Sequence, residues 1–142
     1  MKRTSQNTST ERHARRGVAI VEFALMAPVA LMITFALIEF SRVNMIRNTA
    51  QNAAYEGARA AIIPGGNAAT AKESAEEVLA TIRVKEATVT VDPNTITNTT
   101  PQITVTISIP LGKNMWLAPS YVMDQTMVRS CELNRESTQS GF

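Results

Sequence analysis

Residues 15–23 read Arg-Arg-Gly-Val-Ala-Ile-Val-Glu-Phe and open a long apolar run. From Gly17 to Ile38 there are 22 residues, and Glu22 is the only charged residue among them. A helix rises about 1.5 Å per residue, so this run reaches roughly 33 Å, enough to cross a bilayer core of about 30 Å. The sequence therefore predicts a transmembrane helix over residues 18–38.

Glu22 is the most unusual residue of this run. A carboxylate inside a membrane segment costs on the order of 2.5–3.5 kcal/mol on insertion scales, so an interaction that offsets this cost is expected. We therefore interpret Glu22 as a functional residue. The alternative is that Glu22 lies close enough to the cytoplasmic face to be hydrated.

The charge of the chain is unevenly distributed. Residues 1–17 carry five Lys/Arg and one Glu, a net charge of +4, whereas residues 18–142 carry nine Lys/Arg and eleven Asp/Glu, a net charge of −2. The remainder of the chain shows no basic patch that would indicate nucleic-acid binding. A basic flank before an apolar run predicts a cytoplasmic N terminus. The polar, aperiodic residues 1–14 are expected to be disordered.

The apolar run leads into an amphipathic pattern without a turn signal, which predicts one helix over about residues 18–61. Pro64-Gly65-Gly66 ends this helix, and a second helix is expected over about residues 68–83. The period then changes from 3.6 to 2, which predicts strands over residues 87–91 and 103–109. A third strand is expected over residues 126–133, and a helix is the alternative there.

These elements predict an α+β fold. The N-terminal transmembrane helix continues into a long amphipathic helix, which packs with the second helix on a small antiparallel sheet. Met127, Cys131 and Leu133 are expected on one side of the third strand, and Trp116 is expected to pack against the sheet edge. The expected domain covers residues 39–133, and residues 134–142 are expected to form a disordered tail.

Residues that could support catalysis are sparse. The one histidine, His13, lies in the polar N-terminal arm, and no Cys/His cluster has metal-ligand spacing. A Ser-His-Asp or Cys-His site needs a histidine that the rest of the chain lacks. We therefore expect no enzyme and no bound metal or cofactor. Cys131 is the one cysteine, so it forms no internal disulfide, and we interpret it as a small buried apolar residue.

Two sequence motifs lie along the predicted long helix. The first runs from Arg15 to Leu25 and is followed by Pro28. The second consists of Ile-Glu-Phe-Ser-Arg at residues 38–42 and Asn-Ala-Ala-Tyr-Glu-Gly-Ala-Arg-Ala-Ala at residues 52–61. Together they resemble the TadE-like proteins, which are pseudopilins of bacterial tight-adherence (Flp-type) pilus systems. The resemblance is close over residues 15–61 and looser beyond, and its motif residues on the helix are Glu39, Arg42, Glu56, Gly57 and Arg59.

The resemblance implies proteolytic processing. In that family a prepilin peptidase cuts after the glycine and releases the basic leader, which here implies cleavage between Gly17 and Val18. Residues 1–17 would be the leader, and the implied recognition and assembly residues are Arg15, Arg16, Glu22 and Phe23. The implied partners are the inner membrane, the peptidase, other pilins or pseudopilins and the pilus assembly platform. The implied location is the bacterial inner membrane, with one span, a cytoplasmic N terminus and the domain outside.

Other interpretations remain open at this point. Gly17 could be an ordinary glycine at a membrane boundary, and Glu56 and Arg59 could simply pair on the helix surface while Gly57 allows close packing. Arg15-Arg16 also resembles a twin-arginine export signal, although no convincing small-x-small site follows the apolar run. The main alternative function is an uncleaved single-pass membrane protein whose outer domain binds an envelope or secreted partner.

Overall fold

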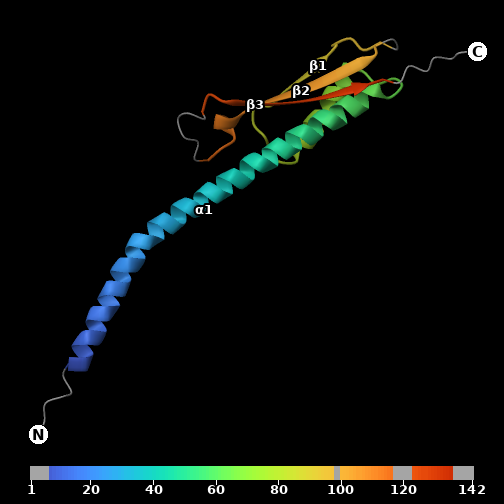
Figure 1. Ribbon diagram of the computed structural model, residues 1–142. Helices are drawn as coiled ribbons and strands as arrows, with labels where there is room; N and C mark the ends of the chain where they lie inside the picture. The colour runs from blue at the N-terminus through green and yellow to red at the C-terminus, as the bar shows by residue number, and fades with distance from the viewer. Residues whose placement is uncertain (1–6, 98–99, 117–122, 136–142) are drawn as a thin grey trace, which may run out of the picture. The chain divides into compact units, whose positions relative to one another are not determined.

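The computed structural model describes residues 7–97, 100–116 and 123–135, and for residues 7–16 it describes the backbone alone. The chain divides into two units, Met1–Ile38 and Glu39–Phe142. Helix α1 spans Asn7–Ile62 and therefore contributes to both units. Each unit is described by itself below (Figure 1).

The first unit contains the N-terminal part of α1. This helix begins at Asn7, so the expectation of disorder over residues 1–14 is wrong from Asn7 onward. Residues 7–16 contain no Pro or Gly, and an established helix extends easily because each added residue gains a hydrogen bond. Helix α1 continues through Pro28, and its apolar side chains after Gly17 are almost all exposed. The helix is long and apolar enough to cross a membrane.

The second unit begins with the remainder of α1, which ends at Ile62 just before Pro64-Gly65-Gly66. Gly65 has a φ of +86°, a left-handed conformation that glycine adopts at little cost. Helix α2 covers Ala68–Ala80 and is capped by Asn67, whose Oδ1 accepts a hydrogen bond of 2.9 Å from the Thr70 N–H. The predicted end of this helix at residue 83 is three residues too late.

Three strands form one antiparallel sheet in the order β1-β2-β3: Thr88–Asp92, Gln102–Pro110 and Thr126–Asn134. A short 3₁₀ helix, η1, covers Leu111–Lys113. The register pairs Val89 with Ile107 and Val105 with Cys131. The third segment is therefore a strand, and the helical alternative is wrong. Met127, Cys131 and Leu133 are half-buried on one side of β3, as the sequence predicted.

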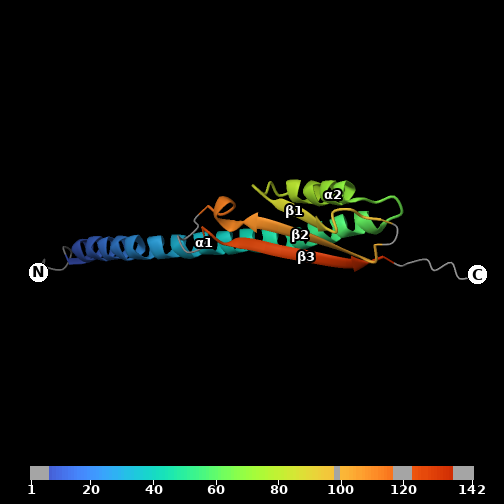
Figure 2. The ribbon, with the colours of Figure 1, turned by 90° about the horizontal axis from the view of Figure 1, so that it is seen from above.

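The core lies between one face of this sheet and the two helices (Figure 2). The strands supply branched side chains and the helices supply mostly small ones. This division follows from the sequence, because alternating Ile and Val fill one face of β2 while alanines recur at helical spacing along α1. The α+β prediction is confirmed. The fully buried residues are Ala53, Ala54, Ala58, Ala61, Ala71, Ala75, Ile103, Val105, Ile107 and Ile109.

Arg135, directly after β3, fastens the end of the sheet to the end of α1. Its guanidinium donates hydrogen bonds to the carbonyls of Ala61, Ile62 and Ile63 at 3.1, 3.2 and 3.3 Å. These carbonyls belong to the last turn of the helix and the residue after it, where intrahelical donors are missing. Ordered contacts therefore extend two residues beyond the predicted domain end at residue 133.

Candidate functional site

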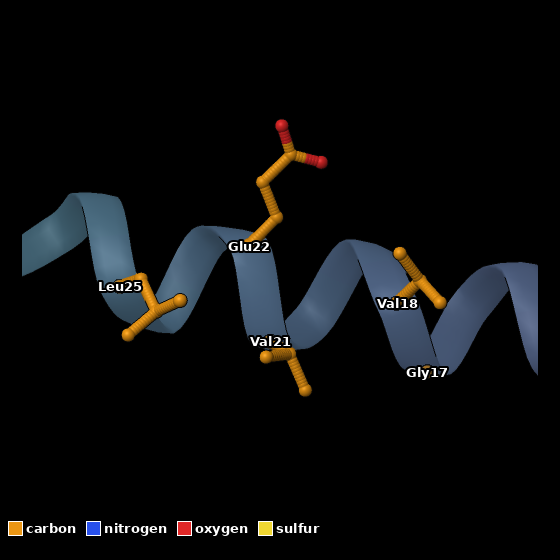
Figure 3. A pocket seen from close by; sticks show the side chains of 5 residues that line it. All are labelled: Gly17, Val18, Val21, Glu22 and Leu25. Carbon is orange, nitrogen blue, oxygen red and sulfur yellow. The ribbon is translucent and has the colours of Figure 1, made fainter.

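Gly17 and Val18 lie inside α1 and are exposed (Figure 3). A Cβ atom added to Gly17 would meet no other atom within 4 Å. Packing therefore does not require glycine at this position, although glycine inside a helix costs about 1 kcal/mol relative to alanine. The residue weakens the helix locally without a compensating contact.

Glu22 projects from an apolar helix surface formed by Val18, Val21 and Leu25, which line a shallow open depression with Gly17 (Figure 3). Within the ranges that the structure describes, ion pairs such as Glu56–Arg59, Lys72–Glu76 and Lys113–Glu86 lie elsewhere, and none is recorded for Glu22. Val18 and Glu22 are four residues apart and therefore share one face of the helix.

The other recognition residues of the first motif also lie on α1. Phe23 is exposed, like its apolar neighbours on α1. Arg15 and Arg16 lie within the helix, and their side chains fall outside the described part.

Glu39 and Arg42 hold the loop after β2 against α1. The backbone N–H of Trp116 donates a 2.8 Å hydrogen bond to Glu39 Oε1, and Glu39 is only 8% exposed. Arg42 Nε donates a 2.6 Å hydrogen bond to the Asn114 carbonyl, and the Arg42 guanidinium carbon lies 5.5 Å from the centroid of the Trp116 ring. The two helix residues are three positions apart, so one turn of α1 contacts two points of the loop. We call the four residues Glu39, Arg42, Asn114 and Trp116 the helix–loop clamp.

Asn114 fixes the other side of this loop. Its Oδ1 accepts the Lys85 N–H at 2.8 Å, while its Nδ2 donates to the carbonyls of Lys85 and Pro110 at 3.0 and 2.9 Å. The residue is 2% exposed, so these bonds satisfy an amide that is removed from water. Trp116 itself is 74% exposed, and the expectation that it packs against the sheet edge is wrong. The backbone of Trp116 is anchored, and its ring stacks on a cation rather than on the core.

The motif at residues 52–61 contains both buried residues that pack in the core and exposed residues at the surface. Gly57 is buried, and a Cβ there would lie 2.8 Å from the Ala71 carbonyl oxygen, 3.1 Å from Ala75 Cβ and 3.4 Å from Val105 Cγ1. Glycine is therefore required where α1, α2 and β2 meet. Glu56 and Arg59 pair at 3.7 Å at the surface, a geometry that contributes little to stability.

In the ranges that the structure describes, no group of three or more His, Cys, Asp or Glu residues is placed to hold a metal ion. Burial raises the pKa of the Cys131 thiol above its ordinary value. In the first unit, the described site is an exposed apolar helix segment with one carboxylate, Glu22.

The long apolar helix and the small sheet covered by two helices on one face define a class of proteins, α+β proteins with one N-terminal apolar helix long enough to cross a membrane. Within this class, residues 17–59 match the TadE-like protein family. The match starts at Gly17, after Arg15 and Arg16 of the first motif, and ends at Arg59 within the second motif, and it confirms the resemblance found in the sequence. The match covers residues 17–59 and not the sheet, and the apolar helix within it is long and apolar enough to cross a membrane. No curated protein and no solved structure gives a match.

Proposed function

We propose that this chain is a minor pseudopilin of a tight-adherence pilus or a related secretion machine, without enzymatic activity, and that prepilin peptidase cleaves it between Gly17 and Val18. The observation that carries the proposal is the environment of Gly17. No neighbouring atom requires a glycine there, yet the family match begins at this residue. A residue without a side chain fits a tight protease site, and the weakened helix opens more readily for cleavage.

Cleavage would also supply a partner for Glu22. The new α-amino group at Val18 lies one helical turn before the Glu22 side chain, or it can pair with Glu22 of a neighbouring subunit. Either arrangement offsets the cost of a carboxylate in the membrane. A carboxylate near a helix N-terminus also interacts favourably with the helix dipole. These interactions make processing a step that stabilises the mature helix in a bundle of pilin helices.

The topology of the proposal follows from charge. The basic arm stays on the cytoplasmic side of the inner membrane, and residues from Glu39 onward form the outer domain. The exposed Glu56–Arg59 pair on α1 and the apolar face of residues 18–38 are the surfaces through which other pilins and the assembly platform would bind. The alternative, an uncleaved anchor whose outer domain binds a partner, has the same topology and differs at one peptide bond.

Intact mass of the membrane-extracted chain tests the cleavage. We expect the mass of a chain that starts at Val18 in cells with active peptidase, and the mass of the full chain in cells that lack it. A chain that keeps residues 1–17 despite active peptidase contradicts the proposal and favours the uncleaved anchor. Gly17→Leu is expected to block the mass change, whereas Gly17→Ala, the matched small substitution, is expected to retain more of it.

Glu22 variants test the assembly step separately. Glu22→Ala is expected to leave cleavage largely intact but to reduce incorporation into the pilus or assembly complex, because the carboxylate partner of the new N terminus is lost. Glu22→Gln keeps the size of the side chain without the charge and should behave like Glu22→Ala, while Glu22→Asp should restore part of the assembly. Normal incorporation of Glu22→Gln would contradict the charge-pairing role.

A further inference from the structure

Two large aromatic side chains are exposed in the second unit, one on its first turn and one in the loop that is clamped to that turn. Phe40 is 68% exposed on α1, and Trp116 has most of its surface in solvent although its backbone is fixed by the helix–loop clamp. Each of these side chains carries a large apolar area that is favourably removed from water. We propose that Phe40 and Trp116 insert into the lipid headgroup region and form an interfacial anchor. This inference rests on the proposed membrane-anchored function.

The position of the two residues along the chain matches the depth of the interface. The apolar run ends at Ile38, and the helix continues without interruption. With a rise of about 1.5 Å per residue, Phe40 lies about 3 Å and Arg42 about 6 Å beyond that end along the helix. The polar region on each side of the hydrocarbon core is roughly 5–8 Å thick. When residues 17–38 span the core, the turn from Glu39 to Arg42 is the first part of the chain to follow it, as an interfacial anchor requires.

The chemistry of the clamp suits this layer. Trp combines an apolar ring with a polar N–H, and it concentrates at membrane–water interfaces for that reason. Arg42 brings a cation beside the Trp116 ring, where lipid phosphates carry negative charge. The one carboxylate of the clamp, Glu39, is buried beneath the loop rather than presented to those phosphates. The clamp side chains that reach solvent are therefore aromatic and cationic.

The helix–loop clamp also fixes the position of Trp116, as an anchor requires. Its N–H is held by Glu39, and the preceding Asn114 is fixed by three side-chain hydrogen bonds to the backbone of Lys85 and Pro110. The ring is consequently presented at a defined height along α1. An anchor at that height would resist sliding of the helix along the membrane normal.

Trp116 is the single tryptophan of the chain, so its fluorescence reports this site alone. The full chain is reconstituted into lipid nanodiscs at one chain per disc, with lipids brominated either near the top or near the end of the acyl chains. We expect blue-shifted emission, weak quenching by acrylamide and a loss of most of the emission with bromine near the top of the chains. Unshifted emission that acrylamide quenches fully and bromine leaves unchanged would overturn the inference.

A matched control moves the fluorophore away from the predicted interface. In the double variant Trp116→Phe, Ile63→Trp, the indole lies after the end of α1, more than 20 residues beyond Phe40. Bromine should leave its emission unchanged. Equal quenching at both positions would mean that the whole domain lies on the lipid surface, which contradicts a local anchor. Arg42→Ala should reduce the quenching of Trp116, because the ring loses the cation that fixes its position.

Two further outcomes separate this inference from the proposed function. A chain that floats with lipid vesicles and is processed, but whose Trp116 stays unquenched, contradicts the anchor alone. A chain that does not float contradicts membrane anchoring and the interfacial anchor together. Emission that shifts to the blue only when chains associate, without bromine quenching, would assign the aromatic surface to another copy of the chain and overturn the lipid assignment.

Discussion

Gly57→Val is the substitution that tests the packing of the outer domain most directly. The added Cβ would lie 2.8 Å from the Ala71 carbonyl oxygen and 3.1 Å from Ala75 Cβ, whereas carbon atoms pack at about 3.5–4.0 Å. Helix α2 would have to retreat by roughly 0.5–1 Å, and a gap of that size removes about a quarter to a half of the dispersion energy of each affected contact. Overpacking of this kind costs about 1–3 kcal/mol.

Valine has a better helix propensity than glycine by only a few tenths of a kcal/mol, which offsets little of this steric cost. We therefore expect a net loss of about 1–3 kcal/mol in the free energy of unfolding. For a domain of about 100 residues this corresponds to a fall in Tm of roughly 4–8 °C for each kcal/mol. Thermal unfolding of the full chain in detergent, followed by Trp116 fluorescence and circular dichroism, measures the change.

Gln51→Val is the control for Gly57→Val, because Gln51 is exposed on the same helix and the substitution adds the same side chain without a new contact. Its effect should stay within about 0.5 kcal/mol. The change in the free energy of unfolding for Gly57→Ala should lie between those of Gly57→Val and Gln51→Val, because its steric cost is offset by a gain of about 1 kcal/mol in helix propensity. An unchanged Tm for Gly57→Val would refute the close approach of α2 to α1.

Three further predictions concern single contacts. Asn114→Ala removes three hydrogen bonds from a buried turn and should lower the free energy of unfolding, measured in urea, by about 2–4 kcal/mol. The loss for Asn114→Asp should be smaller than for Asn114→Ala. A loss below about 1 kcal/mol for Asn114→Ala would be inconsistent with the described bonds. Arg135→Ala leaves carbonyls at the end of α1 without their guanidinium donor and should lower the free energy of unfolding, measured by heating, by about 1–2 kcal/mol. Arg135→Lys should retain part of this stability. Equal stability of the wild type and both variants would argue against this cap. The raised pKa of Cys131 leaves less thiolate at neutral pH, so alkylation by iodoacetamide should be slower than for a free cysteine and should rise only at higher pH; a rate profile like that of the free thiol would contradict this burial.

The elements that the sequence predicts well are those with a local pattern. Ile103 to Ile109 alternate with Thr and Ser, and this alternation alone indicates a strand with one buried face. The alanines of α1 recur at helical spacing, so their burial could be expected as well. Gly57 belongs to the same pattern, and the interpretation that it allows close packing agrees with the structure.

The contacts that the sequence does not predict join distant segments. Arg42 and Asn114 are separated by 72 positions, and Glu39 and Trp116 by 77. Polar residues in loops have no periodicity that would indicate their partners, so the clamp and the cap by Arg135 become visible only in three dimensions. The helical start at Asn7 differs from the prediction for another reason. Local composition favours a disordered arm, whereas extension of a neighbouring helix depends on residues further along the chain.

The alanine stripe of α1 sets limits on how this sequence can diverge. The core positions of α1 from Ala50 to Ala61 already hold alanine or glycine, so almost every replacement there adds volume between α1, α2 and the sheet. The strand positions, such as Ile103 and Ile107, hold large branched side chains that can be exchanged for others of similar volume at modest cost. Mutational tolerance is therefore expected to be low along one stripe of the helix and higher across the sheet.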